Sequence, residues 1–174
     1  MTYDEQEFLI VNVTKMVKNG TMDDVYILEK VKKEEVEQIL FIHSCVPMIK
    51  EFTYNLRYNH SVLTSPYMKA FEELLTQLIF FVIETDTSDP FTADGQPHIK
   101  SQKFLREIKF IDLLIDILIY PFEGENPLFD LNNLTQKSPV TRVCQLIYRL
   151  IKHTVKENEF NKFYSAQWIS HFFH

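Results

Sequence analysis

The sequence predicts a mainly α-helical fold, an armadillo-like or α-solenoid array of antiparallel helices stacked in pairs, with a short N-terminal β-hairpin. From Lys33 onward, apolar residues recur every three or four positions, which is the spacing of helices that bury one face. Strand patterns do not alternate with helical patterns, so no parallel sheet is expected. The 174 residues include 15 Phe and only 3 Gly, which favours long packed elements over loops.

The β-hairpin is predicted from two short runs that flank a tight-turn signal. Residues 7–17 and 25–31 are rich in β-branched side chains, and Asn19-Gly20 lies between them, a dipeptide typical of two-residue hairpin turns. A lone hairpin is marginal in water, so these strands are expected to lean on other structure. Two parts are therefore predicted: 1–32, the β-hairpin, and 33–174, the helical domain.

Five or six helices are expected, one of them over the central segment 99–120. The first runs from Lys33 and is broken or kinked by Pro47. Ser65-Pro66 and Ser138-Pro139 each supply an N-cap and a first-turn proline for one more helix. Loops are expected over 85–97 and 121–139, and a last helix over roughly 161–173. The first strands lack partners and the last residues continue a helical pattern, so both ends are expected to be parts of something larger.

The segment KFLREIKFIDLLIDILIYPF (103–122) could be a membrane span, a buried strand or a core helix. A membrane span needs roughly 20 apolar residues, and this run is too short and contains Asp112 and Asp116. Its apolar residues recur at helical spacing, so we predict one helix over about 99–120 that ends at Pro121. The two aspartates lie one turn apart and are expected on its solvent-facing stripe.

Charge and motifs argue against several classes of function. The net charge of −6 is unlike the basic surface of a nucleic-acid-binding protein. The chain has no phosphate-binding glycine loop and no hydrolase or metalloprotease motif, so we predict neither an enzyme nor a cofactor. His171 with His174, and the acidic stretch 86–95, are the candidate metal ligands; we interpret both as exposed residues without a metal. Cys45 and Cys144 are expected to be reduced, buried thiols.

Two groups of basic residues could hold an anion. The first occupies every third position at the start of the central helix: Lys100, Lys103, Arg106 and Lys109. The second shares one face of the helix that follows Pro139, opposite its apolar stripe: Arg142, Arg149, Lys152 and Lys156. Each group is either a solvated outer face or part of an anion site formed where the two helices meet.

Two stretches resemble the homology domain shared by inositol trisphosphate receptors and ryanodine receptors. They are QKFLREIKFIDLLIDILIYPF and VTRVCQLIYRLIKHTVKENEFNKFYSAQWI. The shared features are a Lys-x-x-Arg helix start followed by an aliphatic run and a Pro-Phe stop, and then Cys-x-x-x-Tyr-Arg on a later helix. These features fall on Lys103, Arg106, Pro121-Phe122, Cys144, Tyr148 and Arg149. Residues 25–41 resemble the family's last β-trefoil strand leading into its first helix, and 71–82 resemble its second long helix.

The resemblance implies the cytosolic helical half of an inositol trisphosphate-binding core, on the endoplasmic reticulum membrane, in a homotetrameric calcium-release channel. Residues 1–32 would be the remnant of a preceding β-trefoil, and adjoining β-trefoil and helical domains would be partners. Lys103 and Arg106 match two phosphate-binding positions. A third falls on Ile99, beside Lys100, so the implied anion contacts are Lys100, Lys103 and Arg106.

One segment of the sequence, 158–160, does not match the family's pattern. A Tyr-Arg-Lys triplet that completes the phosphate site falls here on Asn158, Glu159 and Phe160. Each charge-assisted hydrogen bond contributes about 1.5–3 kcal/mol, so losing two cations should weaken a trisphosphate site by several kcal/mol. The ligand is therefore inositol trisphosphate or another anion. A different class of function also stays open, an α-helical scaffold that binds protein segments without a small ligand.

Overall fold

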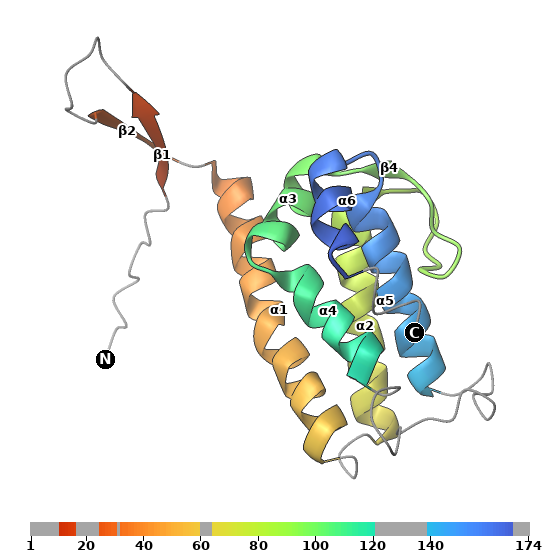
Figure 1. Cartoon of the computed structure of the whole chain (residues 1–174). Helices are drawn as coiled ribbons and strands as arrows, with labels where there is room; N and C mark the ends of the chain where they lie inside the picture. The colour runs from red at the N-terminus through yellow and green to blue at the C-terminus, as the bar shows by residue number, and fades with distance from the viewer. Residues whose placement is uncertain (1–10, 17–24, 31, 60–63, 121–138, 169–174) are drawn as a thin grey trace, which may run out of the picture. The chain divides into compact units, whose positions relative to one another are not determined.

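The computed structural model describes residues 11–16, 25–30, 32–59, 64–120 and 139–168. Their contacts divide the chain into two compact units, Met1–Phe41 and Ile42–His174. The described part is mainly helical with two short antiparallel strand pairs, one of them the N-terminal hairpin, which confirms the predicted fold class (Figure 1). None of the described helices combines the length with the apolar composition that crossing a bilayer requires.

The first unit contains the predicted hairpin. β1 (Val11–Met16) pairs antiparallel with β2 (Val25–Lys30), with Val11 opposite Lys30 and Met16 opposite Val25. This pairing confirms the prediction of two antiparallel strands. The predicted Asn19-Gly20 turn lies outside the described residues. The origin of residues 1–32 as the end of a β-trefoil stays a prediction.

Helix α1 (Lys33–Tyr58) runs without interruption through Pro47, where a break or kink was predicted. Proline has no backbone N–H, so the carbonyl of His43 receives no helical hydrogen bond from position 47. His43 and Pro47 are both exposed, which lets water satisfy that carbonyl. The cost of the proline is therefore small enough for the buried residues on either side to hold one helix together.

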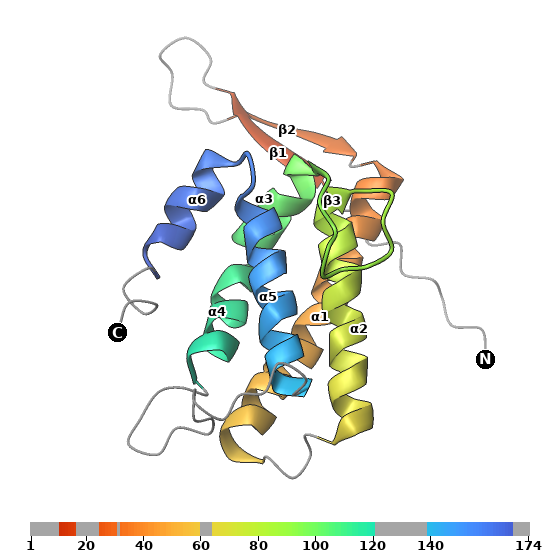
Figure 2. The same cartoon turned by 90° about the vertical axis from the view of Figure 1, so that its right-hand side faces the viewer.

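The second unit is a layered array of antiparallel helices. α2 (Ser65–Val82), α4 (Phe110–Ile119) and α5 (Pro139–Val155) lie alongside the part of α1 from Ile42 on, and α3 (Ile99–Glu107) and α6 (Glu159–Ala166) lie at one end (Figure 2). α2 begins one residue earlier than predicted, because Thr64 takes the N-cap position and places Pro66 in the first turn. α2 packs most extensively against α5.

The core forms from one apolar stripe on each of these helices. Phe52 of α1 stacks on Phe71 of α2, with ring centroids 3.7 Å apart. The other central side chains are at most 1% exposed and are contributed by three helices: Leu75, Leu78, Ile79, Ile111, Leu114, Leu146, Ile147 and Leu150. Burying each such side chain contributes about 1.5–3 kcal/mol, so this stripe is the main source of stability.

The long loop between α2 and α3 is closed at its base by two short strands. β3 (Ile83–Glu84) pairs antiparallel with β4 (Gln96–Pro97). Gly95 lies so close to β3 that a Cβ at this position would be 2.0 Å from the Glu84 carbonyl oxygen. Any other residue would force the strands apart, so Gly95 allows the loop to close.

The prediction of one helix over 99–120 was wrong, because the chain bends between α3 and α4. Lys109 adopts a left-handed conformation with φ of 58°. Its N–H and that of Ile108 bond back to the carbonyls of Arg106 and Phe104, which closes the end of α3. α3 is polar and α4 is apolar, and the bend lets each helix follow its own direction into the array.

Replacing Lys109 with Gly is expected to stabilise the fold by about 1 kcal/mol, because a left-handed backbone costs an ordinary residue roughly that much and costs glycine almost nothing. Urea unfolding measures the change. The matched control is Lys69→Gly, at an exposed position within α2, which should destabilise by about 1 kcal/mol. Two changes of the same sign would contradict the conformational argument.

The last helix also differs from the prediction of 161–173. α6 begins at Glu159 and ends at Ala166, and Trp168 follows in a turn. Asn158 is its N-cap, and its side chain accepts a hydrogen bond from the N–H of Asn161. The earlier start follows from this cap, since asparagine is among the best N-cap residues. Residues 169–173 of the predicted helix lie outside the described part.

Candidate functional site

The three predicted anion contacts lie on α3 with different surroundings. Lys100 and Lys103 are exposed, and the Lys103 ammonium is 3.6 Å from the Glu107 carboxylate one turn on. The Arg106 side chain is only 22% exposed and lies against α6. One of its terminal nitrogens donates to Asn161 Oδ1 at 3.0 Å, and its guanidinium carbon is 5.7 Å from the centre of the Phe160 ring.

The segment that departs from the resembled family lies directly beside α3. Asn158 is buried and donates from Nδ2 to Gln102 Oε1 at 2.9 Å. Glu159 is exposed and pairs with Lys162 at 2.6 Å. Phe160 is 79% exposed beneath Arg106. Helix α3 and residues 158–160 therefore meet in space. Glu159 and Phe160 occupy the two positions where the resemblance predicted cations.

A buried amide cluster, Gln102, Asn158 and Asn161, fastens α3 to the turn between α5 and α6. Gln102 Nε2 donates to the His153 and Lys156 carbonyls at 2.7 and 2.9 Å. Asn161 Nδ2 donates to the Gln102 and Thr154 carbonyls, both at 2.9 Å. The last carbonyls of a helix lack partners within the helix, so these side chains satisfy the end of α5.

The amide cluster holds Arg106 in place. Asn161 is fully buried and uses its Nδ2 on two backbone carbonyls, which leaves Oδ1 pointing at Arg106. Because Asn161 is fixed by those carbonyls and by its own N–H bond to Asn158, the guanidinium has a rigid acceptor. Arg106 is therefore positioned before any ligand arrives.

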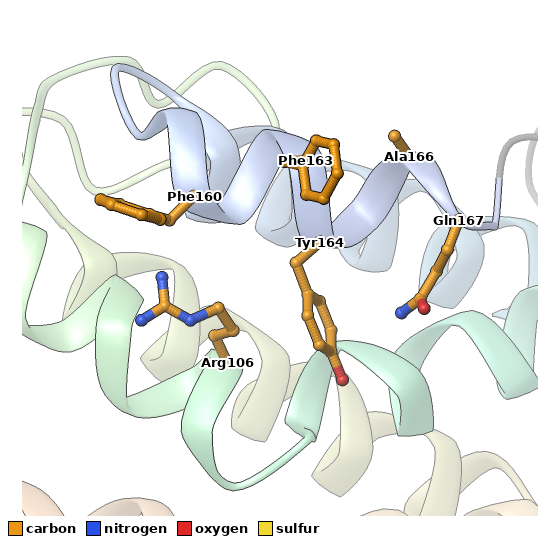
Figure 3. Close-up of a pocket in the computed structure, with 6 residues that line it drawn as sticks. All are labelled: Arg106, Phe160, Phe163, Tyr164, Ala166 and Gln167. Carbon is orange, nitrogen blue, oxygen red and sulfur yellow. The ribbon is translucent and has the colours of Figure 1, made fainter.

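A groove of about 610 Å³ opens beside Arg106 on the surface of α6. Its lining within the described residues consists of Arg106, Phe160, Phe163, Tyr164, Ala166 and Gln167. In Figure 3 the Arg106 guanidinium points toward Phe160, while Tyr164 extends from α6 toward α4. Among the described lining residues only Arg106 is charged, so the groove combines one cation with an aromatic wall.

The direction of Tyr164 is fixed by Asp112 of α4. The Tyr164 hydroxyl donates to Asp112 Oδ2 at 2.6 Å, and Trp168 Nε1 donates to Oδ1 at 3.0 Å. Burial, together with the hydrogen bond and charge of Asp112, raises the pKa of Tyr164 to about 12. The expectation that Asp112 faces solvent was therefore wrong: α6 covers it, and Asp112 anchors α6 through two donors.

The second basic group is partly covered, because the 85–97 loop lies against Arg142, Arg149 and Lys156, whereas Lys152 is exposed. Arg149 donates to the Ala93 carbonyl at 2.7 Å. Lys156 pairs with the Asp94 carboxylate at 2.8 Å and also donates to the Gly95 carbonyl. Arg142 is 3.1 Å from Glu72 and lies over the Phe91 ring. Three of the four cations thus bind parts of the same chain.

His153 lies fully buried on α5, one position after Lys152 and four positions after Arg149. Neither ring nitrogen makes a hydrogen bond within the described residues. The Ala93 carbonyl is near the ring but is already occupied by Arg149. Burial lowers the pKa of His153, and the Arg149 and Lys152 charges lower it further, while Asp94 partly opposes them. The neutral ring is therefore the form that the fold favours.

The free energy of unfolding is expected to fall as pH drops below 6.5, the ordinary pKa of histidine. The folded-state pKa of His153 is lowered, so the unfolded chain takes up the proton first and gains stability relative to the folded one. Urea unfolding between pH 8 and pH 5, about 1.5 pH units either side of that pKa, measures the slope. His153→Leu should flatten it; an unchanged slope in this variant would assign the effect to other groups.

The candidate metal ligands and the thiols have structural explanations where they are described. Asp89 caps its own loop, accepting from the Phe91 N–H and the Thr92 hydroxyl. Within the described residues, no three His, Cys, Asp or Glu side chains gather as a metal site would require. His171 and His174 lie outside that part. Cys45 and Cys144 form no disulfide; Cys45 is buried as predicted, whereas Cys144 is half-buried, and burial raises its pKa to about 11.

Gln102, Asn161 and Tyr164 were not predicted as site residues from the sequence. A glutamine inside a basic helix and an asparagine in an aromatic-rich helix resemble ordinary surface residues. The one available signal was Asn158, since an N-cap residue placed before Asn161 indicates a helix start at this point. It would have located the turn, but not the α3 residues that contact it.

The fold and the α3–α6 junction define a helical-array domain with a prepositioned arginine at an aromatic groove. A family model described as the RIH domain, shared by ryanodine and inositol trisphosphate receptors, matches residues 72–174. The chain belongs to this family, which consists of regulatory domains of calcium-release channels and not of enzymes. The match covers most of α2 and all of α3 to α6, and so includes the whole junction.

Proposed function

We propose that this chain is a regulatory domain on the cytosolic face of the endoplasmic reticulum membrane, within a homotetrameric calcium-release channel. In this proposal it forms the helical half of an inositol trisphosphate-binding core, with an adjoining β-trefoil as the other half. Family membership supports the channel role. The observation that carries the ligand role is Arg106, half-buried, held by Asn161, and facing the segment 158–160.

Coupling to gating would be mechanical. An anion bound at Arg106 acts on Asn161, which is hydrogen-bonded to the end of α5 through the Thr154 carbonyl. Gln102 joins the same end of α5 to α3. These bonds tie α3, α5 and α6 together, so the three helices would move as one body. A ligand that binds two channel states with different affinity would then shift the domain as a unit against adjoining helical domains.

Isothermal titration of inositol trisphosphate tests the ligand role, with the domain joined to its upstream β-domain. Lys103→Ala and Arg106→Ala are each expected to weaken binding by about tenfold or more, since each removes a charge-assisted contact. Lys69→Ala on α2 is the charge-matched control and should bind like the parent. Absence of heat, or heat unchanged in the double variant, would remove the ligand role and leave the channel role standing.

A protein-binding scaffold is the second candidate, favoured by aromatic residues that α1 exposes. Tyr54 and Tyr58 are 59% and 71% exposed, and their rings lie 5.2 Å apart on the outer side of α1. Tyrosines are enriched at the centres of protein interfaces. If the chain is a scaffold, the double variant Tyr54→Ser, Tyr58→Ser should bind the adjoining domains more weakly. The same variant should leave the inositol trisphosphate titration unchanged.

A further inference from the structure

The composition of the α3–α6 groove restricts the ligand that it can take. A trisphosphate needs several convergent cations, because each phosphate must exchange its hydration for charge-assisted hydrogen bonds. The described lining offers one cation, Arg106, together with Gln167 and the rings of Phe160, Phe163 and Tyr164. Glu107 and Glu159 pair with Lys103 and Lys162 nearby, which reduces the positive charge around the groove.

Arg106 retains the capacity to bind an anion. Its guanidinium carries five N–H donors, and the bond to Asn161 uses one of them. The contact with Glu107 is long, at 3.9 Å, and so holds the remaining donors weakly. The guanidinium lies over the Phe160 ring, which lowers the cost of removing water from the cation when a ligand arrives.

The aromatic wall provides the apolar half of a site. Phe163 is 86% exposed and Phe160 is 79% exposed, an arrangement that leaves both rings largely in water. Tyr164 is held in a fixed direction by Asp112, so it forms a rigid side of the groove. A flat or aliphatic group placed against these rings would remove apolar surface from water at about 25 cal/mol per Å².

The size of the groove favours a small molecule over a protein. Its volume of about 610 Å³ lies within the range typical of small-ligand sites. A stable protein interface buries roughly 1,200 Å² or more, and two exposed rings on the eight-residue helix α6 provide much less than that. A peptide that presents an acidic side chain is therefore the less favoured occupant.

We propose that the α3–α6 groove binds a small amphipathic organic anion, with its charged group on Arg106 and its apolar body against Phe160, Phe163 and Tyr164. This inference rests on the proposed function only in using Arg106 as the anion contact; it assigns that site a different ligand class. Phe160 then sets specificity, because it supplies a ring where the resembled family has a cation.

The test uses the 174-residue chain and two fluorescent probes that differ in charge. The first, 1-anilinonaphthalene-8-sulfonate, carries one sulfonate on an aromatic body; the second, N-phenyl-1-naphthylamine, is the same body without it. The chain is expected to bind the sulfonate saturably and about tenfold more tightly than the neutral probe, the difference expected from one charge-assisted contact. Equal affinity for the two probes would overturn the proposal.

Three variants locate the binding. Arg106→Gln should remove the preference for the sulfonate. Phe163→Ser should weaken both probes by about tenfold, as expected for loss of an aromatic contact, and its 86% exposure means that folding is unaffected. Tyr148→Ser, an exposed ring on α5 outside the groove, is the control and should change nothing. Full binding retained in Phe163→Ser would overturn the proposal even if Arg106→Gln failed to fold.

Inositol trisphosphate, added to the domain joined to its upstream β-domain as in the titration above, separates this inference from the proposed function. Sulfonate binding without displacement by inositol trisphosphate would support the amphipathic ligand and count against the trisphosphate role. Binding of inositol trisphosphate without binding of the sulfonate would overturn the inference and leave the proposed function intact. Displacement of the sulfonate by an acidic aromatic peptide but not by a small aromatic carboxylate would assign the groove to a protein partner and would also overturn it.

Discussion

Replacing Gln102 with Leu is expected to lower the free energy of unfolding by about 3–5 kcal/mol, although the two side chains have similar volume. The substitution leaves the His153 and Lys156 carbonyls and the Asn158 amide without their hydrogen-bond partner inside the protein. Each buried group left without a partner costs about 1–3 kcal/mol. Because Gln102 is fully buried, water cannot take its place.

Urea unfolding monitored by circular dichroism measures the loss, with Gln145→Leu as the matched control. Gln145 is an exposed residue of α5, so the same change there should stay within about 0.5 kcal/mol of the parent. The Gln102 variant should also weaken any anion binding at Arg106, because Asn158, which accepts from the Asn161 N–H, loses the Gln102 side chain that holds its amide. A destabilisation no larger than that of the control would show that the amide cluster is not a structural requirement.

Replacing Phe71 with Ala is expected to destabilise the helical unit by about 3–5 kcal/mol. Phe71 is 1% exposed and stacks on Phe52, so its removal both separates α1 from α2 and leaves a cavity in the core. The control is Phe163→Ala, the same substitution at an 86% exposed position, which should cost about 0.5 kcal/mol or less.

Thermal unfolding distinguishes the two variants, since a loss of this size lowers the transition of a domain this long by roughly ten degrees. If Phe71→Ala and Phe163→Ala melted together, the stacked pair would not be part of the core. If Phe163→Ala alone lost stability, α6 would have to be more deeply packed than its exposure indicates.

The sequence predicted the helices well where one face is buried and poorly where tertiary contacts decide. The period of Phe71, Leu75 and Leu78 placed α2, and that of Val143, Ile147 and Thr154 placed α5. The bend at Lys109 was not predictable in this way, because a lysine carries no signal for a left-handed backbone. There the gain from burying α3 and α4 in different directions outweighs the local preference.

The candidate site, too, was only partly predictable from the sequence. The resemblance singled out Arg106 and the segment 158–160 from residue types and their order along the chain. In the structure Arg106 contacts this segment and the residue that follows it: Phe160 lies beneath its guanidinium and Asn161 accepts its hydrogen bond. This contact arises because the chain turns back onto α3 after the end of α5. The second basic group shows the opposite case, since Arg149 and Lys156 looked available for a ligand and are instead bonded to the 85–97 loop.

The sequence by itself determined a helical array after a short hairpin, and family membership, because both follow from periodic apolar residues and ordered local motifs that each element carries alone. The tertiary structure decided which polar side chains meet. Hydrogen bonds such as those from Gln102 to α5 join residues more than 50 positions apart, and no local pattern specifies such a partner. The character of the groove, one fixed cation beside three aromatic rings, is a product of that meeting.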